Sequence, residues 1–254
     1  MTQKQKNLLI GMILGDAYLQ KTGKQNARIR LEHSIKQREY LDWKVSLLKN
    51  YFQSKIQILE RANAFWNKEY QYARIQSTSS PEFGKLQRFF YKQVKKTTES
   101  DSVDELTHEP ERANYSQANL LVKLEDTTAL AVELHRESMK IIPEKINIIF
   151  ISNLSLAVWF MDDGYYYPRD KMSYIYIPNY DEQSIKNLLF SLKENFNLLP
   201  LLKRKKKGLV LVFSVNETRK LMALIKKFII PSMQYKIPLD PVSTERKSDV
   251  RADK

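Results

Sequence analysis

An apolar helical run that ends in an aspartate occurs twice in this chain. The first is LLIGMILGDAYL, residues 8–19, and the second is LAVWFMDDGYYY, residues 156–167. Aligning Asp16 with Asp163 places the two runs 147 residues apart. Because a sequence that repeats usually encodes a structural unit that repeats, we expect two similar halves.

The residues that follow each run predict the same order of secondary structure. Residues 26–33 alternate charged and apolar side chains, and within residues 70–77 Tyr72, Arg74 and Gln76 alternate with Ala73 and Ile75. Both patterns predict strands. Each half is therefore predicted to be helix, two strands, helix, two strands, helix. The other predicted elements of the first half are helices at 37–52 and 81–94. In the second half they are strands at 165–167 and 173–177, a helix at 181–196, a hairpin of 199–204 and 209–214, and a helix at 216–229.

The segment between the halves differs in charge. Residues 97–139 hold ten acidic residues against three basic ones, which leaves the rest of a chain of net charge +13 at +20. We expect a first half at 1–96, an acidic insertion at 97–139 and a second half at 140–254, with a polar tail from about 241. The positive halves predict a polyanionic partner, nucleic acid ahead of a membrane surface, although a merely basic soluble protein stays open.

Two residue types narrow the chemistry. Cysteine is absent, which excludes disulfides, thiolate nucleophiles and cysteine-ligated zinc. The histidines, His33, His108 and His135, share no metal-binding spacing and are expected to be surface or satisfied residues. No apolar run approaches the length of a membrane span and no signal-peptide cleavage site follows the N-terminus, so we expect a soluble intracellular protein.

The aspartates stand where a helix ordinarily disfavours them. A helix C-terminus carries about half a negative elementary charge, so a carboxylate there is destabilising. If Gly11, Gly15 and Ala157 let the two apolar helices pack closely, Asp16 and Asp163 become neighbours that repel unless one is protonated or a cation lies between them. Hard oxygen ligands predict Mg²⁺. The alternative is that each aspartate only caps a loop, but the repetition and the positive surroundings disfavour it.

The two runs, aligned as LIGMILGDA (residues 9–17) and LAVWFMDDG (residues 156–164), resemble the paired signature helices of the LAGLIDADG homing endonucleases. The second resembles the single-chain, two-motif subgroup in particular. The resemblance covers nearly all the chain except residues 97–139 and the tail. It implies an α+β fold, a pseudo-twofold pair of αββαββα halves joined at two packed LAGLIDADG helices. Each half would carry a curved four-stranded antiparallel sheet, and together the sheets would form a DNA-binding saddle.

The resemblance also implies how a metal is held. Asp16 and Asp163 would be the catalytic, metal-binding acids, sharing two or three Mg²⁺ ions. The backbone oxygens of Gly15 and Asp162 would complete the metal sphere, and the Asp162 side chain would not be a primary ligand.

A basic residue just before a proline-containing turn accompanies each active site in this subgroup. MKIIP, residues 139–143, and QYKIP, residues 234–238, fit that pattern and nominate Lys140 and Lys236 as catalytic residues. Read alone, each lysine would more often be an ordinary surface charge.

The polar faces of the implied sheets would lie in the major groove. Arginine can bind guanine and glutamine can bind adenine, each through two hydrogen bonds, whereas tyrosine and lysine more often touch phosphate or sugar. Candidates in the first half are Arg28, Arg30, Glu32, Tyr72, Arg74 and Gln76. Those in the second half are Tyr165, Tyr167, Tyr174 and Tyr176, whose facing depends on the strand register.

The run KRKKKG, residues 203–208, is expected at a hairpin tip. There Lys203, Lys205 and Lys206 would contact phosphates, and a nuclear localisation signal or a solvated turn are the alternatives.

Together these features predict a monomeric, site-specific double-strand DNA endonuclease of a mobile intron or similar element, in an organelle or a bacterial cytoplasm, with no membrane partner. One alternative is an RNA maturase that binds intron RNA, alone or in addition to nuclease activity. Another is a regulator that only binds DNA, which would need an added DNA-reading module that the sequence does not show. Retention of both Asp16 and Asp163 favours the nuclease.

Overall fold

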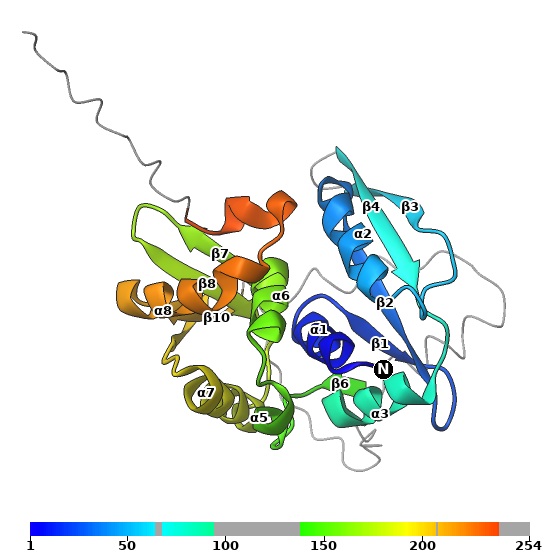
Figure 1. The fold of residues 1–254 in the computed structure, drawn as a ribbon, viewed down its shortest axis with the longest axis horizontal. Helices are drawn as coiled ribbons and strands as arrows, with labels where there is room; N and C mark the ends of the chain where they lie inside the picture. The colour runs from blue at the N-terminus through cyan, green and yellow to red at the C-terminus, as the bar shows by residue number, and fades with distance from the viewer. Residues whose placement is uncertain (64–67, 94–137, 207, 239–254) are drawn as a thin grey trace, which may run out of the picture.

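Two units of the predicted αββαββα order stand side by side in a computed structural model, which describes residues 1–63, 68–93, 138–206 and 208–238 (Figure 1). The expected α+β fold with paired antiparallel sheets is confirmed. The first unit comprises α1 (Gln3–Leu14), β1 (Tyr18–Lys21), β2 (Ala27–Ser34), α2 (Arg38–Leu47), β3 (Gln57–Asn63), β4 (Lys68–Gln76) and α3 (Pro81–Phe90). The short 3₁₀ turn η1 (Ile35–Gln37) leads into α2.

The second unit repeats this order. It comprises α6 (Asn153–Asp163), β7 (Gly164–Tyr167), β8 (Met172–Ile177), α7 (Glu182–Phe196), β9 (Leu201–Lys205), β10 (Gly208–Phe213) and α8 (Val215–Ile225). The short helix α5 (Ile146–Ile149) precedes it, and two 3₁₀ segments, η2 (Lys226–Phe228) and η3 (Pro231–Lys236), follow it.

The two sheets have the same topology. Their strand orders are β1-β2-β4-β3 and β7-β8-β10-β9, and every neighbouring pair is antiparallel. In β2 alternate side chains are buried, so one face of the sheet packs into the core while the other carries the charged residues. The edge strand β9 is exposed along its whole length.

Helices α1 and α6 lie together at the centre of the molecule, between the sheets (Figure 1). Every residue from Leu8 to Leu14 and from Leu154 to Met161 is buried. A helix that is apolar on all sides is stable only where protein surrounds it. One continuous core extends through both units, so the pair acts as the joint between them.

Several expected helices end early. The helix expected over 81–94 ends at Phe90, because Tyr91 starts the strand β5 (Tyr91–Gln93). The helices expected over 37–52 and 216–229 continue only to Leu47 and Ile225. The sequence did not locate β3, since an exposed edge strand lacks the alternation of buried and polar residues that identifies a strand.

Strand β5 pairs with β6 (Ser138–Lys140), which connects the end of the first unit to the start of the second. The expected acidic insertion at 97–139 lies outside the described residues, apart from Ser138 and Met139 in β6, and so does the tail from 239. The expected boundaries after residues 96 and 139 therefore stay predictions.

Candidate active site at the helix junction

Close approach of α1 and α6 brings their C-terminal ends together. A Cβ placed on Gly11 would lie 2.4 Å from the Ser155 carbonyl oxygen, and one on Gly15 would lie 2.4 Å from Asp162 Oδ2. The Ser155 hydroxyl donates to the Asn7 carbonyl at 2.6 Å. The glycines in the signature run are thus explained by helix contact, as the sequence predicted.

Asp16 and Asp163 both stand where a central helix passes into the first strand of its sheet. Asp163 is the last residue of α6, and Asp16 follows the residue that caps α1. Burial raises the pKa of Asp16 to about 6, with a further contribution from the Asp162 carboxylate. Burial, followed by Asp16 and Asp162, raises the pKa of Asp163 to about 8. Both carboxyl groups are therefore protonated more readily than free ones, even though nearby lysines oppose the shift.

The two nominated lysines reach the same junction from opposite sides. Lys140, in β6, donates to the Gly15 carbonyl oxygen at 3.1 Å. Lys236, at the end of η3, donates to the carbonyl oxygens of Met161 at 2.5 Å and Asp162 at 2.8 Å. Burial lowers the pKa of both, that of Lys140 to about 8. Each lysine thus contacts the carbonyl of the residue that immediately precedes Asp16 or Asp163 in the sequence.

Three charged or polar groups that the sequence did not assign complete the junction. The Asp162 side chain, expected near the metal but not as a primary ligand, accepts from Lys44 Nζ at 2.6 Å, and neither side chain is exposed to solvent. Lys44 Nζ also lies 3.0 Å from His33 Nε2, and His33 Nδ1 lies 3.6 Å from Asp16 Oδ2. Burial, followed by the Lys44 charge, lowers the pKa of His33 to about 3, so the ring is neutral. Of the two expected alternatives His33 is thus the satisfied residue, buried with a hydrogen-bond partner, and it lies beside Asp16.

Two groupings could hold a cation here. One is Asp16, His33 and Asp162, whose ligand atoms lie within 4.8 Å of one another. Lys44 already places an ammonium against both His33 and Asp162, and a divalent ion in the same space would be repelled. The other grouping is Asp16 with Asp163, where hard oxygen donors and raised carboxyl pKa values suit a divalent cation. The donor set therefore fits a metal best between the two helix-end aspartates.

The outer face of the first sheet carries the predicted polar residues. The register places Arg30 opposite Gln76 and Glu32 opposite Arg74, so these side chains share one face. Glu32 accepts from Arg74 at 2.6 Å and pairs with Arg61 at 2.7 Å. Arg28 donates to Gln20 at 2.9 Å, Arg30 lies over the Tyr18 ring, and Arg61 lies over the Tyr72 ring. The arginines are held side by side, with the Arg61 side chain 47% and the Arg74 side chain 24% exposed.

The outer face of the second sheet is aromatic instead. Tyr165 is paired with Tyr174, and Tyr165 stacks on both Tyr174 and Tyr176, with ring centroids 5.0 and 6.1 Å away. The register therefore answers what the sequence left open, because Tyr165, Tyr167, Tyr174 and Tyr176 all share this face. Tyr174 itself is 8% exposed beneath its neighbours.

The basic run differs from its expected position. Lys203 and Lys205 lie within the edge strand β9, and only Lys206 lies in the turn that follows. Lys203 is opposite Val210, and Lys205 Nζ lies 4.1 Å from the centre of the Tyr174 ring, so both lysines are on the tyrosine face. The turn is shorter than the sequence predicted because β9 and β10 pair as far as Lys205 and Gly208.

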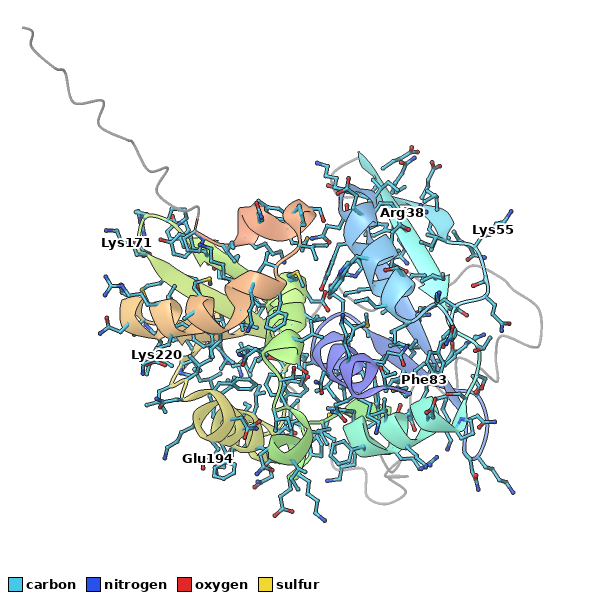
Figure 2. All side chains as sticks on the ribbon, in the orientation of Figure 1. Arg38, Lys55, Phe83, Lys171, Glu194 and Lys220 are labelled. Carbon is cyan, nitrogen blue, oxygen red and sulfur yellow. The ribbon has the colours of Figure 1, made fainter. Side chains whose placement is uncertain are left out.

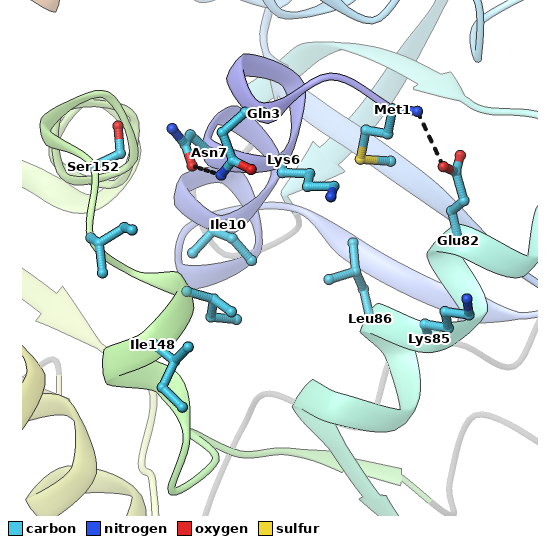
Figure 3. Close-up of a pocket in the computed structure, with 12 residues that line it drawn as sticks. Met1, Gln3, Lys6, Asn7, Ile10, Glu82, Lys85, Leu86, Ile148 and Ser152 are labelled. Atoms are coloured by element: carbon cyan, nitrogen blue, oxygen red, sulfur yellow. Dashed lines mark hydrogen bonds and ion pairs between the residues drawn. The ribbon is translucent and has the colours of Figure 1, made fainter.

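A pocket of about 850 Å³ lies at the opposite end of α1, between that helix, α3 and α5 (Figure 3). Met1, Asn7 and Ser152 line it, whereas the aspartates stand at the other ends of α1 and α6. The pocket reaches along α1 only as far as Ile10 and does not include the aspartates. None of the helices in the described ranges combines the length and apolar character needed to cross a membrane.

The raised pKa of Asp163 predicts pH-dependent stability. Between pH 6.5 and 7.5 the folded carboxyl keeps a proton that the unfolded one, with a pKa of 3.8, has released, so the free energy of unfolding falls as pH rises. We expect a fall of about 1 kcal/mol in the metal-free protein, and little or none in Asp163→Asn. His33 contributes equally to both proteins: it is neutral when folded but about half protonated at pH 6.5 when unfolded, so it opposes the fall slightly without changing the difference between them. Urea denaturation with a chelator tests this, and equal slopes in both proteins would contradict it.

Comparison with known proteins places this geometry in context. The sequence model of the LAGLIDADG DNA endonuclease family matches residues 6–110 and 115–221. Probable intron-encoded endonuclease 1 of Wickerhamomyces canadensis is 24% identical over 238 residues, 92% of this chain and 83% of that protein. Probable intron-encoded DNA endonuclease 3 of Mycosarcoma maydis is 27% identical over 88 residues, 35% of this chain and 65% of that protein.

A solved structure shares the fold. The homing endonuclease I-WcaI, bound to its DNA recognition sequence, superposes with a TM-score of 0.69 over 95% of this chain and 88% of that one, at 22% identity. The shared fold includes both units and the joint between them.

Proposed function

The chain belongs to the LAGLIDADG DNA endonuclease family, and we propose that it is a monomeric homing endonuclease that cuts both strands of one long DNA site with Mg²⁺ bound between Asp16 and Asp163. The observation that carries the proposal is the convergence of two helix-end carboxylates, with raised pKa values, beside two buried lysines. The relatives' names support the intron-encoded endonuclease role.

The aspartates and nearby backbone would hold the metal. The carboxylates of Asp16 and Asp163 would bind it with the backbone oxygens of Gly15 and Asp162. Both carbonyls accept hydrogen bonds from Lys140 and Lys236, and each oxygen has a second lone pair with which it could bind the metal. When bound, divalent ions supply an activated water and a Lewis acid at the phosphate, and they stabilise the leaving oxygen.

Lys140 and Lys236 act through their charge and their fixed position. Each is held by carbonyl oxygens at the helix ends, so its ammonium lies close to where a phosphate would meet the aspartates. A preorganised positive charge stabilises the extra negative charge of the transition state without any rearrangement. The pKa of Lys140, lowered to about 8, still leaves this group mostly protonated near pH 7.

The sheets supply binding and sequence recognition. In the first unit the outer face presents Arg28, Arg30, Arg74 and Gln76, which match guanine and adenine in the major groove. Glu32 holds Arg61 and Arg74 in place in the free protein, and Tyr72 supports Arg61. In the second unit Tyr174 and Tyr176 form an aromatic floor beside Lys203 and Lys205, and these groups suit sugar, phosphate and base-methyl contacts.

The test is cleavage of a plasmid library that carries randomised inserts and the joined exon sequences flanking the reading frame. We expect a linear product with short 3′ overhangs in Mg²⁺ and none with a chelator. Cleavage that needs no metal would contradict the proposed chemistry. A protein that binds intron RNA and promotes splicing without cutting DNA would support the maturase alternative instead.

The lysines of β9 and its turn should bind DNA without regard to sequence. We expect the triple replacement of Lys203, Lys205 and Lys206 by glutamine to weaken binding to all DNA sites alike. The slope of log Kd against log salt should fall by about 2 to 3, because each phosphate contact contributes close to 1. Fluorescence anisotropy at several salt concentrations measures this, with Lys186→Gln on α7 as the control. An unchanged slope in the triple variant would remove these lysines from the interface.

A further inference from the structure

A buried ion pair joins the two units at the active site. Lys44 lies on α2 of the first unit and Asp162 lies on α6 of the second, and their side chains are 2.6 Å apart with no exposure to solvent. Lys44 also lies over the Tyr40 ring, at 4.3 Å, and the Tyr40 hydroxyl donates to the Val158 carbonyl of α6. Removing two charges from water is costly, and such a pair is rarely retained for stability alone.

The same contacts continue to Asp16. The Asp162 carboxylate accepts from the Asp16 backbone N–H at 3.3 Å, and Lys44 faces His33 Nε2 at 3.0 Å. Because an ammonium can only donate, Nε2 accepts and the proton of the neutral ring lies on Nδ1. Nδ1 lies 3.6 Å from Asp16 Oδ2, which is longer than a hydrogen bond, and the ring also hydrogen-bonds the Gln37 side chain. The Asp16 backbone thus contacts Asp162, and the Asp16 carboxylate lies near His33.

The second unit has no such contacts at the corresponding positions. Tyr18 pairs with Arg30, and Tyr165, at the same distance after its aspartate, pairs with Tyr174. His33, three residues after Arg30, therefore corresponds to Ile177, which is buried in the core.

The same shift of 144 residues along the chain relates Lys44 to Leu188, which is buried in the middle of α7. Asp162 corresponds to Gly15, one residue before each catalytic aspartate. Where the first unit has an imidazole and an ammonium, the second has two aliphatic side chains.

We propose that Lys44, His33 and Asp162 form a one-sided positioning network in which the Lys44 ammonium is a fixed internal cation. It neutralises Asp162, which would otherwise repel Asp16 and compete for the metal, and it fixes the His33 ring beside the Asp16 carboxylate. Asp163 has no counterpart of this network among the described residues. The inference rests on the proposed nuclease function. It implies that cleavage of one DNA strand depends on this network and that cleavage of the other strand does not.

Two variants of His33 separate its two contacts. Asparagine places an amide where Nδ1 lies, beside Asp16, and glutamine places one where Nε2 lies, beside Lys44. We expect His33→Gln to slow cleavage of one strand at least tenfold more than the other. His33→Asn should keep the ratio of the two strand rates within about threefold of wild type. Single-turnover cleavage of duplexes labelled on each strand gives both rates.

The coupling between Lys44 and Asp162 is tested by thermal stability, without a cleavage assay. We measure the Tm of the metal-free protein for Lys44→Met, Asp162→Asn and the double variant. Lys44→Met leaves a buried carboxylate alone and should lower Tm most, and the double variant should recover at least half of that loss. Lys186→Met is the matched control, since Lys186 and Glu182 are also 2.6 Å apart but exposed, and its Tm should stay unchanged.

The outcomes separate this inference from the proposed function. Additive Tm losses in the double variant, or equal slowing of both strands by His33→Gln, would overturn the network. If the wild-type protein cuts no DNA, the nuclease proposal fails, while the Tm comparison still decides whether Lys44 and Asp162 act as a coupled pair.

Discussion

Replacing Asp16 or Asp163 with asparagine is expected to abolish DNA cleavage while leaving DNA binding intact. Asparagine keeps the shape of the side chain but loses the negative charge that binds a divalent cation. Each change should slow cleavage at least about 10³-fold, which corresponds to roughly 4 kcal/mol of activation free energy. Binding should be retained because the arginines and lysines proposed to contact DNA lie on the sheets and not at the junction.

Electrophoretic mobility shift and single-turnover cleavage on the same duplex measure the two effects separately. Lys220→Gln is a suitable control, since Lys220 projects from α8 at the edge of the second unit, away from the junction (Figure 2). An Asp16→Asn or Asp163→Asn protein that cuts as fast as wild type would show that the chemistry lies elsewhere.

Replacing Gly11 with leucine is expected to separate the two central helices. Even a single Cβ there would lie 2.4 Å from the Ser155 carbonyl oxygen and 2.8 Å from the Val158 Cβ, so the backbones must move apart. We expect a loss of about 3 kcal/mol in the free energy of unfolding. For a chain of this size that lowers Tm by roughly 6 to 12 °C. Cleavage should fall further than stability, since a shift of about 1 Å between reacting groups costs on the order of 100-fold in rate.

Gly23→Leu provides the matched control because a Cβ on Gly23 meets nothing within 4 Å. Its effect should stay within about 0.5 kcal/mol. Differential scanning calorimetry of both variants measures the two losses of stability. Similar Tm losses for Gly11→Leu and Gly23→Leu would mean that the helix contact does not hold the units together.

The repeat made most of the fold predictable. Aspartates at matching positions, glycines within the runs and the strand alternation at 26–33 were enough to predict two αββαββα units with a helical joint. The lysines before the proline-containing turns were found only through resemblance, because nothing local to Lys140 or Lys236 distinguishes them from surface charges. The structure brings both to the helix ends, but their catalytic role stays a prediction.

Sequence analysis did not identify His33, Lys44 and the Asp162 side chain as parts of the site. They come together only through tertiary contacts. His33 does fall on the buried face of an alternating strand, and Lys44 follows Tyr40 and Leu41 on the buried face of α2. A lysine in the apolar stripe of a helix was therefore the one available signal. Its partner lies 118 residues away, which no local pattern can reveal.

The tyrosines show a different limit. Which face a strand presents depends on register, and a shift of one residue would turn Tyr165, Tyr174 and Tyr176 toward the core. The paired strands settle this, and they also reveal that the two saddle faces differ, one built on arginine and the other on stacked tyrosine.

The most direct measurement of the central claim is anomalous diffraction from crystals of the protein–DNA complex grown with Mn²⁺. We predict metal peaks between Asp16 and Asp163, with the Lys44 ammonium still bound to Asp162 and His33. A peak enclosed by Asp16, His33 and Asp162, with Lys44 displaced, would contradict both the assignment of the paired helix-end aspartates as the metal site and the role of Lys44 as the internal cation.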